Sequence, residues 1–317
     1  MERREFLAHV GAGALGVSAW SRSALGQTAA FNPDIELELR AAPAVVSILP
    51  GDATRVWRYT GNLRKGPATT IQPVADSYLG PILRFQAGQR VRVHFINDLP
   101  EASIVHWHGL DVPTDADGHP RLAVASGQHY VYEFTVINRA GTYWYHPHPH
   151  MRTAYQAYHG LAGLIIVTDA EEGRLQLPAG DDELVCVIQD RRFDAANQLA
   201  YLAGGGMAAG GRMSGMGMGP GMMEAMNGFL GDRILVNGRP PAPRALATRV
   251  YRLRLMNGSN SRVYKLAWDN ARPITVIGTD GGLLQAPVTR PYLALAPGER
   301  VDTLLDLRDV PVGTTMT

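Results

Sequence analysis

The sequence predicts an all-β protein built from two tandem β-sandwiches. Glycine and proline contribute 35 and 21 of the 317 residues, which favours a fold with many turns. No segment keeps the 3.6-residue period of a helix over about 12 residues. Short runs that alternate apolar and polar residues recur instead, separated by turn residues, and this pattern is typical of sandwiches and barrels.

These alternating runs occur along the whole chain after its N-terminal region. Each is bounded by turn residues and is therefore predicted to be a strand. The predicted strands of the first half are 35–40, 55–59, 90–96, 130–136 and 164–168. Those of the second half are 183–189, 248–256, 274–278 and 300–307.

The two halves resemble each other. Segment 88–97 (GQRVRVHFIN) is echoed by 247–257 (ATRVYRLRLMN), and 126–134 is echoed by 297–305. We therefore expect two copies of one β-sandwich. Acidic residues, glycine and proline cluster near 169–182, so we place the first domain at 27–169 and the second domain at 170–317.

The N-terminal 26 residues have the layout of an export signal. Arg3 and Arg4 precede a mildly apolar run over 10–20 and small residues at 24–26. The run is shorter than the roughly 20 apolar residues of a membrane span. The Arg-Arg-x-Phe-Leu pattern resembles the twin-arginine (Tat) signals of bacteria. We expect a periplasmic or secreted protein with no membrane span after signal removal.

Net charge and cysteine content exclude several classes of protein. The formal net charge of +1 argues against nucleic-acid binding, which requires a basic surplus. A single cysteine excludes an intrachain disulfide and a Cys-rich zinc or iron–sulfur site. Cys186 lies in an apolar run and is predicted to be a buried strand residue.

A low-complexity loop, 203–226, holds seven of the eleven methionines. One hypothesis is a flexible insert without a function of its own. The other is a segment that collects cuprous ion, because thioethers are soft ligands suited to Cu(I). The residues that would do so are Met213, Met216, Met218, Met222 and Met223.

Two His-x-His pairs predict a metal centre. His106 and His108 form one pair, and His146 and His148 form the other. On a strand, residues i and i+2 share a face, so each pair presents two imidazoles side by side. Zinc remains an alternative if Asp111 joins the first pair, although His-x-His-x-x-Asp is not the usual hydrolase spacing. An all-imidazole set favours copper.

The motifs around these pairs resemble those of the multicopper oxidases, most of all the bacterial laccase-like and cuprous oxidases. They are HWHG at 106–109, GTYWYHPHPH at 141–150, GLAGLIIV at 160–167, GDRILVNG at 231–238 and RLRLMNGSN at 252–260. The resemblance implies cupredoxin-like Greek-key β-sandwiches. It also implies that His106 binds the type 2 copper and that His108, His146 and His148 bind the type 3 pair.

The resemblance further implies an activity. Phenols, aromatic amines or cuprous ion would be oxidised one electron at a time, and O2 would be reduced by four electrons to water. Asp117 matches by spacing an acidic residue that assists proton delivery near the trinuclear copper centre. Asp111 is a second candidate for this role, and an ordinary Asp-Gly turn is the alternative for Asp117.

The resemblance also shows what to expect outside this sequence. Cys186 lies in no His-Cys-His motif, so the type 1 copper and the other trinuclear ligands are expected in a third domain absent from this chain. We therefore expect a truncated chain that is inactive alone. Two alternatives remain: a copper-binding or copper-resistance protein without oxidase activity, and a copper-free structural relative such as the cell-division proteins of this fold.

Overall fold

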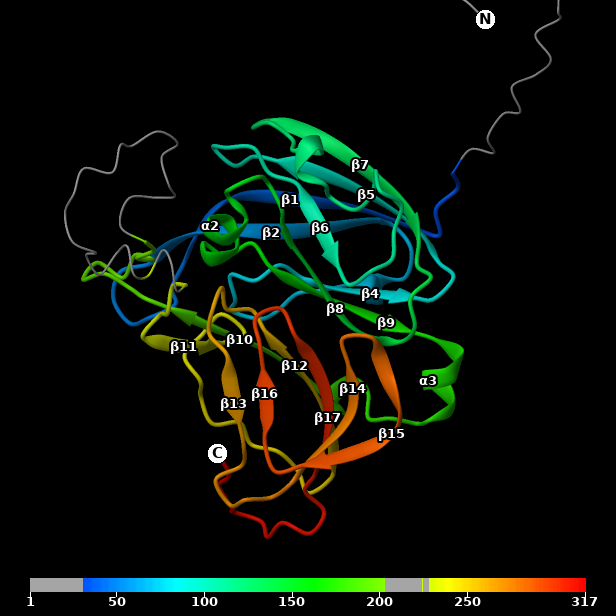
Figure 1. The fold of residues 1–317 in the computed structure, drawn as a ribbon, viewed down its shortest axis with the longest axis vertical. Coiled ribbons are helices and arrows are strands. Elements are labelled where there is room, and N and C mark those ends of the chain that lie inside the picture. The colour runs from blue at the N-terminus through cyan, green and yellow to red at the C-terminus, as the bar shows by residue number, and fades with distance from the viewer. Residues whose placement is uncertain (1–30, 203–223, 225–227) are drawn as a thin grey trace, which may run out of the picture. The chain divides into compact units, whose positions relative to one another are not determined.

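The first half of the chain forms two sheets that enclose one core (Figure 1). This computed structural model describes residues 31–202, 224 and 228–317. The first sheet has the order β2-β1-β5-β7, with β1 (Ile35–Val46), β2 (Thr54–Lys65), β5 (Arg90–Asn97) and β7 (Gln128–Thr135). The second has the order β3-β4-β9-β8-β6, with β3 (Ile71–Gln72), β4 (Ile82–Gln86), β6 (Val105–His108), β8 (Gly141–Pro147) and β9 (Gly163–Thr168).

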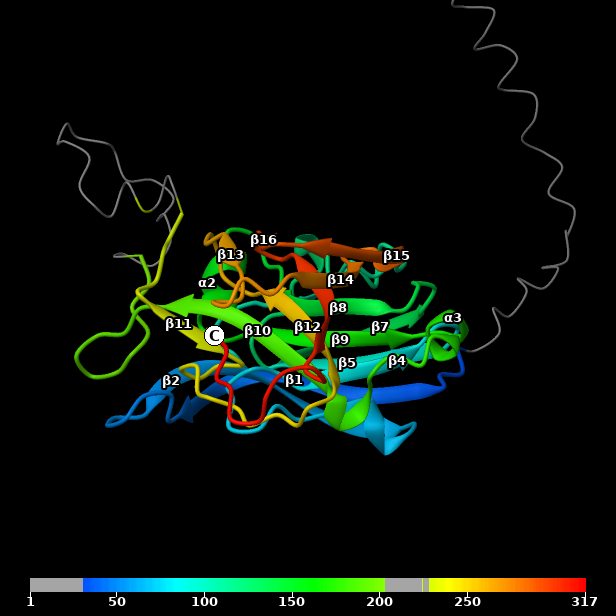
Figure 2. The same cartoon turned by 90° about the horizontal axis from the view of Figure 1, so that it is seen from below.

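The second half also forms two sheets, which Figure 2 shows from below. The larger has the order β11-β10-β12-β17-β14-β15, with β10 (Glu183–Arg191), β11 (Arg233–Val236), β12 (Val250–Asn257), β14 (Ile274–Thr279), β15 (Gly282–Arg290) and β17 (Arg300–Asp306). The smaller pairs β13 (Tyr264–Leu266) with β16 (Leu293–Leu295). These sheets confirm the all-β prediction.

The helices whose bounds lie within the described residues are short: α2 (Thr153–Tyr158), α3 (Ala170–Arg174) and the 3-10 turns η1 (Ala68–Thr70), η2 (Pro120–Leu122) and η3 (Gly180–Asp182). In the described part of the chain, no helix has the length and apolar character needed to cross a membrane. The expected signal at 1–26 and the five methionines of the 203–226 loop lie outside the described residues and stay predictions.

The nine predicted strands are all present, and the structure adds others that the sequence did not indicate. β3, β13 and β16 are only two or three residues long, too short to show an alternating period. β15 is mostly exposed and therefore has little apolar face to recognise. The predicted domain boundary at 169/170 falls between β9 and β10. Residues Pro33–Thr317 form one compact unit, which is not divided at this position, so the boundary stays a prediction.

The internal echo corresponds to a repeated sheet. β1 is antiparallel to β2, parallel to β5 and followed across the sheet by antiparallel β7. β10 has the same relations to β11, β12 and β17. The second echo recurs in the turns that precede β7 and β17, where the N–H of Gly127 donates to Asn97 and that of Gly298 to Asn257.

The strand-ending asparagines have the same role in both copies. Asn97 and Asn257 are fully buried. The Asn97 amide donates to two backbone carbonyls, at 2.8 and 2.9 Å, and its Oδ1 accepts from a backbone N–H. Asn257 repeats this arrangement with donor distances of 2.7 and 2.8 Å. Each side chain therefore fixes the loop that follows its strand.

We expect Asn97→Ala and Asn257→Ala each to lower the free energy of unfolding by roughly 2–3 kcal/mol, because each leaves buried backbone groups unpaired. Since the two asparagines share no hydrogen-bond partner, the double variant should show the sum of the two losses. Urea unfolding of the three variants measures both effects. Losses of a few tenths of a kcal/mol would show that water satisfies these groups.

A buried network of ion pairs connects the two halves. Arg254 on β12 bonds Glu183 on β10 at 2.6 Å and Asp302 on β17 at 2.8 Å. The Thr142 hydroxyl on β8, in the first half, donates to Asp302 at 2.6 Å and accepts from Arg254 at 3.0 Å. Arg252 pairs with Asp302 at 2.7 Å and also with Glu172 of α3. These charges are almost fully buried, so each depends on its partners.

Glu183 gives this network a pH dependence. Burial opposes its ionisation, but the guanidinium groups of Arg254 and Arg84 outweigh that effect, so the pKa of Glu183 lies below its usual value of 4.5. The stabilisation is present above about pH 4.5 and is lost as pH falls through the lowered pKa, because only the unfolded chain binds the proton in between. We expect urea midpoints to fall more steeply below about pH 4.5 in the parent chain than in Glu183→Gln. Parallel midpoint curves for the two proteins would contradict this.

Candidate metal centre

Two neighbouring strands carry the predicted histidines. β6 runs antiparallel to β8, and His106 lies directly opposite His146. His108 is two residues further along β6 on the same face. His148 lies one residue beyond the end of β8, where its backbone N–H still donates to Ile104. The structure therefore brings all four predicted ligands together.

The imidazole rings form a compact group. The His106 ring centroid lies 5.7, 5.3 and 5.2 Å from those of His108, His146 and His148. Potential ligand atoms of His106, His108 and His146 all lie within 4.8 Å of one another. His148 is outside this tightest trio, with its ring 6.1 Å from that of His146. The spacing fits imidazoles that share one or more metal ions.

Hydrogen bonds fix which ring nitrogens can bind a metal. Nδ1 of His106 lies 2.8 Å from the carbonyl oxygen of Asp117, and Nδ1 of His146 lies 2.8 Å from that of Pro147. A carbonyl only accepts, so both Nδ1 atoms carry hydrogen and each Nε2 has a lone pair, which on His146 faces Nδ1 of His108 at 3.3 Å. The buried Nδ1 of His148 has no hydrogen-bond partner among the described residues, which suits a ligand atom.

Burial favours the neutral form of three of these imidazoles. Burial, aided by Arg300, lowers the pKa of His108 to about 4. Burial also places the pKa of His146 well below 6.5, and burial together with His106 lowers that of His148. A metal ligand must be unprotonated, so the group is ready to bind a cation at neutral pH.

Asp117 lies beside His106, whereas Asp111 and His150 do not line the histidine pocket. One carboxylate oxygen of Asp117 is 3.2 Å from Nδ1 of His106, and the side chain is 45% exposed. It can therefore contact both solvent and the cluster. Asp111 is exposed and does not line the histidine pocket, which argues against its role in a zinc site. His150 is also exposed.

The histidines line a pocket of about 420 Å³ at the junction of the two halves. Helix α2 contributes one wall, and the loops 258–260 and 297–298 of the second half contribute another. Trp144 packs its ring 4.2 Å from that of His146. Residues 258–260 of the second-half wall end the RLRLMNGSN motif, and Trp144 lies inside the GTYWYHPHPH motif, but neither motif indicated that these residues line the histidine pocket.

Arg300 holds the second-half wall against the histidine strands. It lies on β17, and its side chain is 3% exposed. Its Nε donates to the carbonyl of Thr142 on β8 at 3.0 Å, and its NH1 donates to that of Gly298 at 2.9 Å. A Cβ on Gly298 would lie 3.5 Å from the His108 ring. One guanidinium thus fixes the distance between the turn and the cluster.

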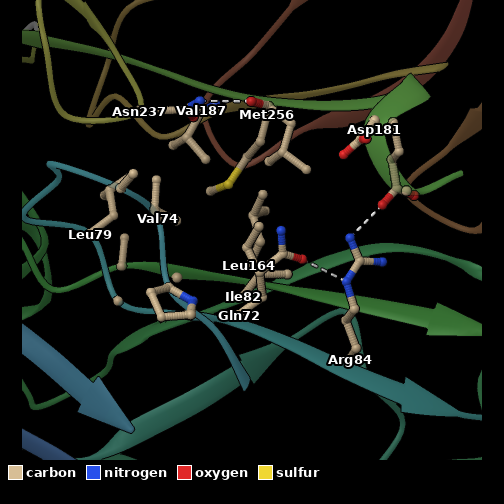
Figure 3. A pocket seen from close by; sticks show the side chains of 18 of the residues that line it. Gln72, Val74, Leu79, Ile82, Arg84, Leu164, Asp181, Val187, Asn237 and Met256 are labelled. Atoms are coloured by element: carbon tan, nitrogen blue, oxygen red, sulfur yellow. Dashed lines mark hydrogen bonds and ion pairs between the residues drawn. The ribbon is translucent and has the colours of Figure 1, made fainter. Parts of the chain in front are cut away.

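A separate cavity of about 290 Å³ lies between the halves (Figure 3). Leu79, Ile82 and Leu164 face Val187 and Met256 across it, and the hydrogen bond between Arg84 and Gln72 lies at one end. None of its lining residues lines the histidine pocket. Apolar residues of the core between the halves line it together with charged residues such as Arg84 and Glu183, and it is not part of the metal centre.

Cys186 lies on β10, as predicted, and is only partly exposed. Burial raises the pKa of its thiol to about 11, so it is protonated at neutral pH. It does not belong to the histidine group. Among the described residues, that group is the single set of three or more potential ligands close enough to share a metal ion.

The fold and the site together define a class of β-sandwich proteins with a cluster of imidazoles at the junction of the two halves. Residues 56–172 match the family model described as multicopper oxidase. The chain belongs to the multicopper oxidase family, whose members bind copper, and its sheets are cupredoxin-type.

Relatives agree with this assignment. The multicopper oxidase mco of Staphylococcus aureus is 30% identical over 269 residues, which cover 85% of this chain and 52% of that protein. The cell division protein FtsP of Escherichia coli K12 is 33% identical, over 79% of this chain and 49% of that protein. The structure of McoA multicopper oxidase from the hyperthermophile Aquifex aeolicus matches with a TM-score of 0.73 at 36% identity, over 89% of this chain and 56% of that one. The chain thus spans about half the length of the curated relatives it matches.

Proposed function

We propose that His106, His108, His146 and His148 hold copper as part of the oxygen-reducing centre of a multicopper oxidase. One observation carries this proposal: four imidazoles converge on one pocket, and the buried Nδ1 of His148 has no hydrogen-bond partner among the described residues. Imidazole donors without thiolate or carboxylate suit copper. By resemblance, His106 would bind type 2 copper and the other three the type 3 pair.

In this proposal, bound copper supplies single-electron transfer toward O2, and the chain supplies positions and protons. The reductant would be a phenol, an aromatic amine or cuprous ion. Asp117 is placed to deliver protons, since its carboxylate contacts both solvent and His106. The four histidines are half of a trinuclear ligand set, so further ligands and the type 1 copper would come from outside the described residues. A Tat-type export signal would place the protein in the periplasm or outside the cell.

Copper titration of the purified chain tests the proposal. Wild-type protein should retain copper after desalting, with nitrogen coupling in the electron paramagnetic resonance spectrum. His106→Ala and His146→Ala should weaken copper binding by about 100-fold or more, beyond the 10–100-fold typical of outer-shell changes. His129→Ala, an exposed histidine on β7, is the matched control. Equal copper retention by all four proteins would overturn the assignment.

A second candidate function follows from the similarity to FtsP, a cell division protein. A structural role without copper would need neither histidine pair. It predicts no specific copper binding and no effect of the His106 and His146 variants on the role in the cell. Copper retention without oxidase activity, measured on the natural full-length protein, would instead favour a copper-binding or copper-resistance role.

A further inference from the structure

An aromatic pocket lies on the other side of helix α2 from the histidines. It has a volume of about 470 Å³ and is formed by the facing ends of β1 and β2, by α2 and by the segment 198–199. Thr153, Ala154 and Ala157 of α2 line the histidine pocket, whereas Tyr155 lines the aromatic one. The two pockets therefore share one short helix as a wall.

Aromatic rings form a fixed wall of this pocket. The rings of Tyr155 and His159 stack with centroids 4.0 Å apart, and Arg152 lies 3.8 Å over the Tyr155 ring. Trp57 is 5.6 Å from Tyr155 and 5.9 Å from His159. The backbone N–H of Trp57 donates to the carbonyl of His159 at 2.8 Å, which ties β2 to the end of α2.

The wall also has a defined hydrogen-bonding character. Nδ1 of His159 lies 2.8 Å from the carbonyl oxygen of Tyr155, so Nδ1 carries the hydrogen and Nε2 is an acceptor. Nε2 has no hydrogen-bond partner among the described residues, and it is not one of their buried unpaired atoms. Burial lowers the pKa of His159, in keeping with a neutral ring.

The strands contribute a more open part of the lining. Pro43, Ala44 and Val45 of β1 are apolar, Val45 is 67% exposed, and Arg55 of β2 adds one charged side chain. The base is rigid, because the side chain of Gln198 bonds three backbone groups. A flat apolar ring would cover Val45 and pack against Trp57 and His159, and a single donor on that ring would satisfy Nε2.

We propose that this pocket binds a small planar aromatic molecule with one hydroxyl donor, a phenol in the simplest case, with its ring against Trp57 and His159 and its O–H donating to Nε2 of His159. The proposal needs no metal and is independent of the copper assignment. Neither the family match nor the motifs assign a ligand to this pocket. The bound ring would lie about one helix diameter, roughly 10 Å, from the histidine pocket.

Ligand-observed NMR with three probes tests this pocket. Phenol should bind more tightly than anisole, which cannot donate, by the roughly 2–10-fold that one hydrogen bond contributes. Cyclohexanol, which donates but is not aromatic, should bind more weakly than phenol. His159→Phe should keep anisole binding and abolish the preference for phenol. His129→Phe, at an exposed site, should change nothing.

A second variant guards against a folding defect in His159→Phe. Val45→Asp changes an exposed strand position, so the chain should fold. The substitution places a charge in the pocket. Both aromatic probes should then bind at least 5-fold more weakly, because an apolar contact is replaced by a charge. The proposal is overturned if phenol binds the parent chain no better than cyclohexanol. It is equally overturned if folded Val45→Asp binds both aromatic probes as tightly as the parent chain, or if folded His159→Phe keeps the preference for phenol.

Discussion

Asp302→Ala should lower the free energy of unfolding by about 3–5 kcal/mol, the loss expected when one partner of a buried ion pair is removed. Asp302 pairs with both Arg252 and Arg254 and accepts from Thr142 in the first half. Its side chain is 4% exposed, so water cannot replace it. Two guanidinium groups would lose a counter-charge in the interior. Denaturant unfolding of the purified chain, followed by circular dichroism, measures the loss.

Asp309→Ala is the matched control. Asp309 also pairs with an arginine, Arg272, at 2.6 Å, but its side chain is 72% exposed. An exposed pair of this kind contributes little to stability, so the Asp309 variant should unfold close to the parent chain. Asp302→Asn keeps a hydrogen-bond acceptor for Thr142 and should fall between the two. Equal stability of the Asp302 and Asp309 variants would mean that the network contributes nothing beyond a surface pair.

Gly118→Ala should damage both the fold and the metal centre. Gly118 has a φ of +79°, and an added Cβ would lie 2.0 Å from the carbonyl oxygen of Val105 on β6. The loop must move away from β6, taking with it the Asp117 contacts to His106. We expect a loss of about 3 kcal/mol from strain and overpacking together. Copper affinity should fall about 10–100-fold, as when a ligand loses its outer-shell partner.

Gly127→Ala separates backbone strain from the clash. Gly127 has a nearly identical φ of +74°, but nothing lies within 4 Å of its added Cβ. It should lose only about 1–2 kcal/mol and keep the parent copper affinity. Isothermal titration with Cu(II) and urea unfolding of the two variants give the comparison. A Gly118→Ala chain with the copper affinity of the Gly127→Ala chain would refute the link between this loop and His106.

The sequence was enough to predict the parts of this molecule that depend on local pattern. Alternation located the longer strands, and the His-x-His spacing located four side chains that the structure brings together. The pairing of His106 with His146 across β6 and β8 depends on strand register, which no local pattern encodes. Sequence distance therefore could not show which imidazoles are closest, nor that His148 lies outside the tightest trio.

The sequence also could not show which side chains are buried by contacts between segments that are distant in the chain. Arg252, Arg254 and Arg300 read as ordinary polar positions of alternating strands, yet each is buried at the contact between the halves. Their partners lie in distant segments such as 142 and 172. The same is true of the aromatic pocket, since Trp57 and His159 are far apart in the chain and meet only because β2 is tied to α2.

The two equivalent turns that precede β7 and β17 now differ in their surroundings. Gly127 faces open space, whereas Gly298, with the same hydrogen bond and a similar φ, lies against His108. In a duplicated architecture the same turn therefore occurs twice, and the two copies have different neighbours. At the first copy a substitution is tested only against backbone strain. At Gly298 a substitution must also leave the position of His108 unchanged. Gly127 and Gly298 have equivalent backbones, but we expect Gly298 to tolerate fewer substitutions.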